Sequence, residues 1–412
     1  MSEASTSSAS GAYSGPSFGT AKSDHSPLRI GFEVINGGNA AVSAAFGSPV
    51  NFGDGKAEVN AIVEDVNAHG GVGGHPIVPV FGIWNVTDMD AGREKSCTQM
   101  TEDGHAVLLI TVINMAESFI ACAAKHHVPV INASIAAGDD DMYKRFRDYL
   151  FSPSLMSLNR EESLLMGNLR DQKFLNSAEK AGVIIDAVAD PQYQRVYKAT
   201  VKPQLDAWGI KHVTYEVKSQ ADMNNAVLKM RTDNVKTVFF IAPSGVIEIL
   251  FMQAAENQNY RPIYGFGDSS SAWFVSTTAP QAQAAGIRGV GSLPLANVDV
   301  AQYPTTPLER KCLDLIRAKG ENNRDRHSSI TATVYCEAIR VLQAVGTKLS
   351  GTLNPASLRT AYAKLGTSYQ PISTFSTNFA SGRTDNATSY RRLSWNGKCR
   401  CVTYTTPARS IP

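Results

Sequence analysis

The stretch from Ala57 to Val80, AEVNAIVEDVNAHGGVGGHPIVPV, decides how the rest of the chain is interpreted. The apolar residues of its first half recur at the spacing of one helix face: Val59, Ile62, Val63 and Val66. Two glycine pairs follow, and glycine commonly ends a helix because it adopts the left-handed conformation without a steric penalty. Ile77–Val80 then has the composition of a buried strand. The stretch predicts a helix, a glycine turn and a strand.

A dinucleotide-binding turn is the competing interpretation of these glycines. That motif needs a strand before the glycines and a helix after them. Here the order is reversed, because the glycines follow a helix and precede a strand. The order therefore argues against a nucleotide fingerprint.

Composition narrows the choice of partners. The chain has 412 residues, enough for two or more lobes with sizeable cores, and its net charge is only +2. Such a charge gives no electrostatic case for nucleic acid or an anionic membrane as partner. No apolar run approaches the ~20 residues that a membrane helix needs. Six cysteines are compatible with an oxidising compartment.

The first 26 residues are dominated by Ser, Ala, Gly and Thr, so we expect residues 1–26 to form a flexible linker. They contain neither the basic nor the apolar region of a signal peptide. The segment resembles the tether that follows the lipid-modified cysteine of surface lipoproteins. We expect an exported protein in which Met1 stands in place of the signal, with a lipid anchor upstream of the linker. A cytoplasmic protein with an unstructured start is the alternative.

After the linker, continuous apolar runs alternate with helical patterns, which indicates parallel sheets covered on both faces. In the first half, the expected strands are residues 28–34, 77–81, 107–112 and 128–131. In the second half, they are residues 181–187, 211–217, 237–241 and 262–265. Helices are expected between them, and three more are expected around residues 308–319, 330–349 and 356–365. The tail, residues 373–405, has a strand-like pattern with turn signals at Gly382 and Asn396-Gly397.

Asp65-Val66-Asn67, the glycine pairs and the following strand resemble the first helix-turn-strand of the Leu/Ile/Val-binding family of solute-binding proteins. The order of elements resembles the type I periplasmic binding protein fold over nearly the whole chain after residue 27. The resemblance implies two doubly wound parallel-sheet lobes joined by three crossovers, near residues 151–153, 286–294 and 372–379. It assigns residues 27–152 plus 290–372 to the first lobe, and residues 153–289 plus 373–412 to the second.

By resemblance, the protein is an extracytoplasmic, cell-surface or periplasmic monomer that captures a small molecule between its lobes and delivers it to the permease of an ABC importer. A sensory ligand-binding domain on the same fold is the alternative from another class. No cofactor and no nucleic-acid partner are expected. An enzyme would need a clustered acid, base and nucleophile, and none is visible. The adjacent pair His126-His127 diverges on a helix, which disfavours a metal site.

Ligand contacts are expected in loops beyond the carboxyl ends of the strands. The candidates are Asn36, Asn114, Ser134, Tyr193, Ser244 and Asp268. The resemblance gives Tyr193 the place of a cleft tyrosine. It puts Gly267 where an acid usually meets the ligand ammonium, with Asp268 one position later.

Several of these candidates also have a purely structural interpretation. Asp268 and the serines after it could cap a helix, Tyr193 could start a surface helix, and Asn36 could belong to a simple turn. Asp139–Asp141 is expected to be a solvated loop or a helix start, and both Trp84 and Trp273 are better assigned to the core.

The expected ligand follows from what the aligned loops lack. Ile113 and Ala136 stand at positions where amino-acid-binding relatives use hydroxyl groups for the ligand carboxylate, and the acid is displaced to Asp268. A free amino acid needs both charges paired. We therefore expect a small, partly apolar or aromatic organic solute, with leucine, isoleucine or valine as the alternative.

The cysteines form two pairs at matching places. Cys97 and Cys122 lie on consecutive helices of the first lobe, and Cys312 and Cys336 have the same relation in the return segment. Both pairs could meet the ~5.5–6 Å Cα separation that disulfides favour, so we predict both bonds. Cys399 and Cys401 are two residues apart, and whether they pair is left open.

Overall fold

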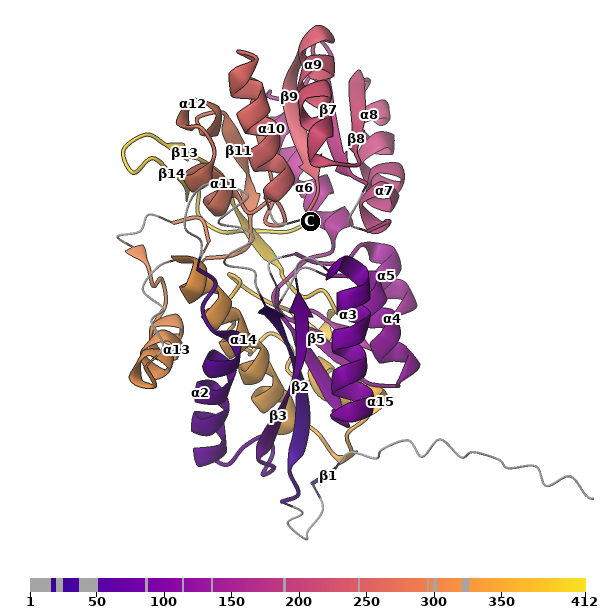
Figure 1. Ribbon diagram of the computed structural model, residues 1–412, viewed down its shortest axis with the longest axis vertical. Coiled ribbons are helices and arrows are strands. Elements are labelled where there is room, and N and C mark those ends of the chain that lie inside the picture. Colours follow the sequence, from indigo (N-terminus) through magenta and orange to yellow (C-terminus); the bar gives the residue numbers. More distant parts are fainter. Residues whose placement is uncertain are drawn as a thin grey trace, which may run out of the picture.

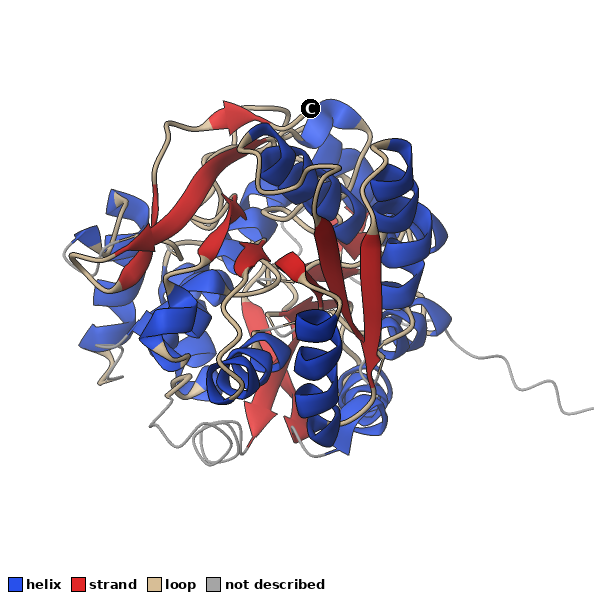
Figure 2. Cartoon of the chain, turned by 90° about the horizontal axis from the view of Figure 1, so that it is seen from above, coloured by secondary structure: helices blue, strands red, loops and turns tan. Residues whose placement is uncertain are grey.

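The computed structural model describes residues 16–19, 25–36, 51–85, 88–112, 115–134, 136–187, 190–243, 245–294, 296–298, 302–320 and 326–412. These residues form two α/β lobes stacked along the long axis (Figure 1). Viewed from above, helices lie around the strands (Figure 2). The predicted doubly wound architecture is confirmed.

The sheet of the first lobe contains five parallel strands among the described residues, in the order β3-β2-β4-β5-β6. Their bounds are β2 Leu28–Asn36, β3 Ile77–Asn85, β4 Leu108–Thr111, β5 Val130–Asn132 and β6 Leu150–Phe151. One face carries α3 (Met89–Thr98), α4 (Glu117–Lys125) and α5 (Asp140–Arg145). The other carries α2 (Gly55–Ala68) and the return helices α13 (Pro307–Ala318), α14 (Arg326–Gly346) and α15 (Pro355–Ala363).

The stretch that decided the interpretation is confirmed in detail. Asp54 caps α2 by accepting hydrogen bonds from the amides of Lys56 and Ala57, and the predicted apolar face is buried. At the helix end, the Asn67 side chain donates to the carbonyl of Ile77 at 2.9 Å and accepts from its amide at 2.7 Å. Gly71 has φ +69°, and a Cβ there would lie 2.1 Å from the His75 carbonyl oxygen. Only glycine fits this turn, which brings α2 back onto β3.

The second sheet follows the order β14-β13-β11-β10-β9-β7-β8, with β15 paired to β13. Its parallel strands are β7 Lys180–Asp186, β8 His212–Val217, β9 Val235–Ile241, β10 Ile263–Phe266 and β11 Ile287–Gly291. The tail adds the antiparallel strands β13 Ser389–Asn396, β14 Cys401–Tyr404 and β15 Arg409–Ser410. The turn predicted at Asn396-Gly397 joins β13 to β14.

Helices cover both faces of the second sheet. One face carries α6 (Leu158–Asp171), α7 (Gln192–Val196) and α8 (Lys202–Ala207). The other carries α9 (Met223–Thr232), α10 (Val246–Asn257), α11 (Ala272–Thr278) and α12 (Gln281–Ala284). Within the described part of the chain, no helix is both long and apolar enough to cross a membrane.

Two predicted boundaries need correction. β11 pairs with β10 and β13 up to Gly291, so the boundary at residue 290 cuts through a strand of the second lobe. The linker prediction fails at residues 17 and 18, which form strand β1 (Ser17–Phe18) against β12 (Gly351–Thr352). Phe18 is only 2% exposed and packs against the His75 ring, because one aromatic side chain is enough to bury a short segment of an otherwise polar stretch.

Candidate functional site

The carboxyl ends of the two parallel sheets face each other, and polar contacts join the lobes there. Asp190, which follows β7, accepts a hydrogen bond at 2.9 Å from the amide of Glu117 at the start of α4. The Gln192 side chain donates to the Met115 carbonyl at 3.2 Å. The loops after β4 and β7 are therefore in direct contact, at the carboxyl ends of the strands where this class of sheet binds ligands.

Arg195 of α7 forms ion pairs between the lobes. Its guanidinium lies 2.6 Å from a carboxylate oxygen of Asp139 and 2.8 Å from one of Glu117, both in the first lobe. The bond to Asp139 raises the pKa of Arg195, and Arg145 is the largest influence lowering the pKa of Glu117. We call Arg195, Asp139 and Glu117 the interlobe clasp (Figure 1 shows α7 directly above α5).

Asp139 illustrates what the sequence interpretation missed. It starts a helix as expected, since its carboxylate accepts from the Met142 amide at 2.9 Å and caps α5. It is not solvated, however: the residue is 1% exposed and ion-paired with the second lobe. A run of three aspartates gives no hint of a distant arginine.

On the first-lobe edge, Glu33 of β2 is fully buried and surrounded by donors. Thr111 and Ser96 donate to its carboxylate at 2.7 and 3.1 Å, and the Arg93 guanidinium lies 3.6 Å away. Arg93 also lies over the Trp84 ring, 4.1 Å from its centroid. This edge therefore contains a buried charge whose partners are already in place.

The second-lobe edge contains two neighbouring buried carboxyl groups, those of Glu161 and Asp268. The Glu161 carboxylate of α6 accepts from the amide and hydroxyl of Ser269 at 2.9 and 2.6 Å. Burial and the neighbouring Asp268 raise the pKa of Glu161 to about 8, and burial raises that of Asp268 to about 6. A Cβ at Gly267 would lie 2.0 Å from the Glu161 carboxylate. Glu161 thus fills, from another helix, the space beside the position where the resemblance implies an acid.

Asp268 itself is only partly available to a ligand. One carboxylate oxygen accepts from the amide and hydroxyl of Ser292, both at 2.6 Å, while the other has no hydrogen-bond partner among the described residues. Its side chain does not cap α11, and the N-cap Ser271 has no side-chain capping bond either. The capping alternative is wrong, whereas a ligand role for Asp268 stays a prediction.

The other predicted contacts divide into three groups. Ser134 and Tyr193 are each 2% exposed, so Tyr193 is not a surface residue. Asn36 is exposed and donates to Asn85 of the adjacent strand at 2.8 Å. Asn114 and Ser244 lie outside the described residues. Trp273 is buried, as expected, and Trp84 is half-buried under Arg93.

Two further buried acids escaped the sequence interpretation. Glu162 on α6 and Glu248 on α10 are 1% and 0% exposed, and burial raises the pKa of each well above its usual range. Glu248 is the single charged residue in the apolar run 246–255, which is a signal that could have found it.

All three cysteine pairs are bonded in the structure. Cys97–Cys122 joins α3 to α4, and Cys312–Cys336 joins α13 to α14, each with Cα atoms 6.3 Å apart. The two bonds predicted in the first lobe are therefore present, on opposite faces of its sheet. Cys399–Cys401, which the sequence left open, closes the β13–β14 turn with a Cα separation of 5.2 Å.

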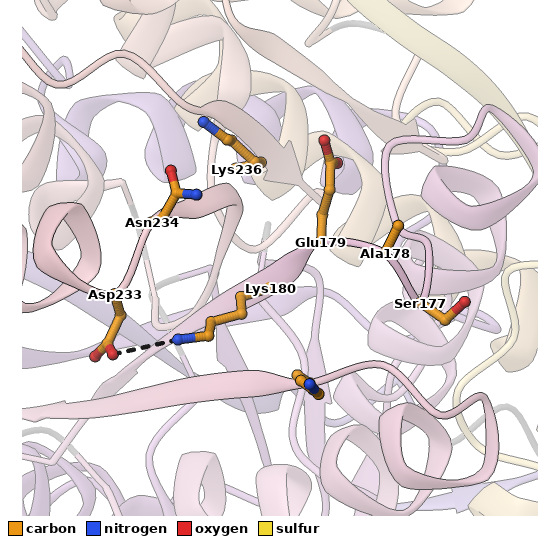
Figure 3. A pocket seen from close by; sticks show the side chains of 8 residues that line it. Ser177, Ala178, Glu179, Lys180, Asp233, Asn234 and Lys236 are labelled. Atoms are coloured by element: carbon orange, nitrogen blue, oxygen red, sulfur yellow. Dashed lines mark hydrogen bonds and ion pairs between the residues drawn. The ribbon is translucent and has the colours of Figure 1, made fainter.

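A shallow pocket of about 280 Å³ lies at the other end of the second lobe, where β7, β8 and β9 begin. It is lined by Ser177, Ala178, Glu179, Lys180, Lys211, Asp233, Asn234 and Lys236. Figure 3 shows the Lys180 side chain extending to Asp233, at 3.5 Å. Both partners are substantially exposed, so the pocket is a solvated surface hollow away from the cleft.

Comparisons with known proteins agree with this geometry. The branched-chain amino acid substrate-binding protein LivJ from Streptococcus pneumoniae, solved with isoleucine, has 17% identity and a TM-score of 0.65, covering 92% of this chain and 100% of its own. A branched-chain amino acid ABC transporter protein from Thermus thermophilus with bound valine has 15% identity and a TM-score of 0.70, at 93% and 96% coverage. A solute-binding protein from R. palustris in complex with 4-hydroxybenzoate has 13% identity and a TM-score of 0.68, at 94% and 98% coverage.

At these identities, the solved structures establish the fold alone. No curated protein sequence matches the chain. A model of the periplasmic binding protein family, by contrast, matches residues 41–391, which is most of the chain. Its members are extracytoplasmic solute-binding proteins rather than enzymes. The chain belongs to the periplasmic binding protein family.

Proposed function

We propose that this protein captures a small, partly apolar or aromatic organic solute and delivers it, as a monomer, to the permease of an ABC importer. The interlobe clasp is the observation that supports closure most directly. Arg195 joins the lobes by pairing with Asp139 and Glu117, so the closed arrangement has its own electrostatic stabilisation. Binding energy then comes from enclosing the solute between loops that the two sheets position.

The apolar character of the solute rests on the loops that meet at the interface. Met115 and Tyr193 are buried where the lobes touch, and they supply apolar and aromatic surface. One solved relative binds 4-hydroxybenzoate, and two others bind isoleucine or valine. The branched-chain amino acids are accordingly the alternative ligands. A lipid anchor upstream of residues 1–26 is part of the same proposal, since the Ser/Gly-rich segment has the composition of a surface tether.

Small-angle scattering of the Arg195→Ala variant tests the clasp. Removing the arginine leaves the buried Asp139 carboxylate without its cation, which should cost about 2 kcal/mol of closure and weaken solute binding about thirtyfold. We expect a larger radius of gyration than for the wild type. Arg261→Ala is the matched control, because Arg261 pairs with Glu256 at 2.6 Å within the second lobe only. Equal radii for all three proteins would contradict a role of the clasp in closure.

A further inference from the structure

Glu248 is a buried carboxylate without a satisfying partner, at the edge of the second lobe that faces the cleft. It lies in the first turn of α10, which follows β9 at the carboxyl edge of the sheet. The residue is 0% exposed, and neither carboxylate oxygen has a hydrogen-bond partner among the residues that the structure describes. A buried acid left in this state costs free energy unless a ligand completes it.

The groups that face Glu248 add negative rather than positive charge. Asp186 at the end of β7 raises the pKa of Glu248 beyond the effect of burial, while the nearby Ser270 hydroxyl offsets only part of the rise. Glu248 in turn raises the pKa of Glu162 on α6 and of Tyr193 on α7. Among the described residues, Arg93 is a cation close enough to lower the pKa of Tyr193 from across the interface.

Arg93 does not make the net charge around Glu248 positive. Its guanidinium is 3.6 Å from the fully buried Glu33 and lies over the Trp84 ring. Glu33 therefore balances the charge of Arg93 before any ligand arrives, and a ligand carboxylate would gain little from it. On the second-lobe side, the described residues of the cleft therefore favour a positively charged ligand group. A negatively charged ligand group would gain no uncompensated cation from them.

We propose that the solute is an organic amine, whose cationic nitrogen binds between Glu248 and Asp186 while its apolar body contacts Tyr193. The inference rests on the proposed function and specifies its ligand: a cation with an apolar or aromatic body, ahead of a carboxylate or an amino acid. In this inference the counter-charge for the ligand cation is supplied by Glu248 on α10, rather than by an acid in the loop after β10.

Binding of such a cation is coupled to the ionisation of Glu248. Burial raises the pKa of Glu248 well above its usual range, which favours the protonated carboxyl in the folded protein. An ammonium group stabilises the ionised form, so Glu248 releases its proton to solvent as the ion pair forms. Binding should therefore release protons and become tighter as the pH rises toward that pKa.

Three ligands with the same aromatic body and different charges test the inference: phenethylamine, phenylacetate and phenylalanine. Isothermal titration calorimetry of the full chain, in two buffers of different ionisation enthalpy, measures affinity and proton release together. We expect phenethylamine to bind most tightly. Glu248→Gln should weaken its binding about tenfold to a hundredfold and abolish proton release, because an amide cannot provide a counter-charge. Glu256→Gln is the matched control, since it makes the same change at the half-buried far end of α10, where Glu256 pairs with Arg261.

The outcomes separate this inference from the proposed function. If phenylacetate or phenylalanine binds more tightly than the amine and Glu248→Gln has no effect, the amine inference is wrong and solute binding stands. If none of the three binds and native mass spectrometry of the freshly purified protein releases no small molecule, both fail. Thermal melting of each variant shows whether the fold is retained, and Asp186→Asn provides a second route to the same loss.

Discussion

On the first-lobe edge of the cleft, the buried Glu33 receives two hydroxyl hydrogen bonds and an arginine. On the second-lobe edge, the equally buried Glu248 has no hydrogen-bond partner among the described residues. Both are carboxylates at the carboxyl ends of parallel sheets, so position alone does not set their roles. The difference lies in whether the protein itself supplies the counter-charge. A carboxylate completed by its own lobe stabilises the fold, whereas one left incomplete is available for a ligand.

The largest expected difference is in unfolding free energy, between a variant that lacks the Glu33 carboxylate and one that lacks the Glu248 carboxylate. Glu33→Ala leaves Arg93 buried without its anion, and breaking such a pair costs about 3–5 kcal/mol of unfolding free energy. Glu248→Gln leaves no hydrogen-bond partner behind, because neither carboxylate oxygen has one among the described residues, so its effect should lie within about 1 kcal/mol. Urea unfolding monitored by tryptophan fluorescence measures both. Comparable destabilisation by the two variants would remove the distinction between the edges.

The pH dependence of the unfolding free energy is a second test of the comparison, with an effect of intermediate size. Glu161 has a pKa of about 8 in the fold against 4.5 ordinarily, and Asp268 about 6 against 3.8. The folded state therefore holds more protons than the unfolded state across this range, and stability should fall as the pH rises from about 4.5 to about 8. The slope for one such proton is at most ~1.4 kcal/mol per pH unit.

The variant Glu161→Gln should flatten most of this slope, and Glu161→Gln with Asp268→Asn should flatten the remainder, because the two groups titrate together. Chemical unfolding at pH 5, 6, 7 and 8 provides the measurement. An unchanged slope in the double variant would show that these acids do not titrate between the folded and unfolded states.

The smallest expected effect is at the opposite end of the second lobe. Lys180→Ala removes a 3.5 Å pair with Asp233 in which both side chains are substantially exposed. Surface pairs of this kind contribute up to about 1 kcal/mol, so stability should change little and solute affinity not at all. Calorimetry with the ligand that binds the wild type provides the check. A marked loss of affinity would mean that the hollow in Figure 3 communicates with the cleft.

The fold could be predicted from the sequence because the patterns that indicate it are local. The apolar spacing of Val59–Val66, the glycine turn and the continuous strands each depend on neighbouring residues, and the structure confirms them. The cysteine pairing followed from the order of the elements alone. Phe18 was missed because a single aromatic residue in a polar segment has no periodicity to reveal its burial.

The cleft was less accessible because its residues converge from distant parts of the chain. Arg195 and Asp139 are 56 residues apart, and Glu161 and Ser269 are 108 apart, so no spacing rule links them. Family resemblance directed attention to the loop after β10, where Asp268 is largely occupied by Ser292. Buried acids lie instead on helices, at Glu161 and Glu248. Glu248 had a local sign, as a lone acid in an apolar run, whereas Glu161 lies in the charged stretch 160–162 and had none.

Strand β1 attaches the start of the described chain to the first lobe. Ser17 and Phe18 pair with β12 at the end of the first lobe farthest from the second, as Figure 1 shows. The Pro16 carbonyl also accepts from the Leu353 amide at 3.3 Å. The described chain therefore begins at this remote end, and its first strand is attached to the first lobe. In a membrane-attached protein, the first lobe would be the stationary body, and opening and closing would be a swing of the second lobe above it.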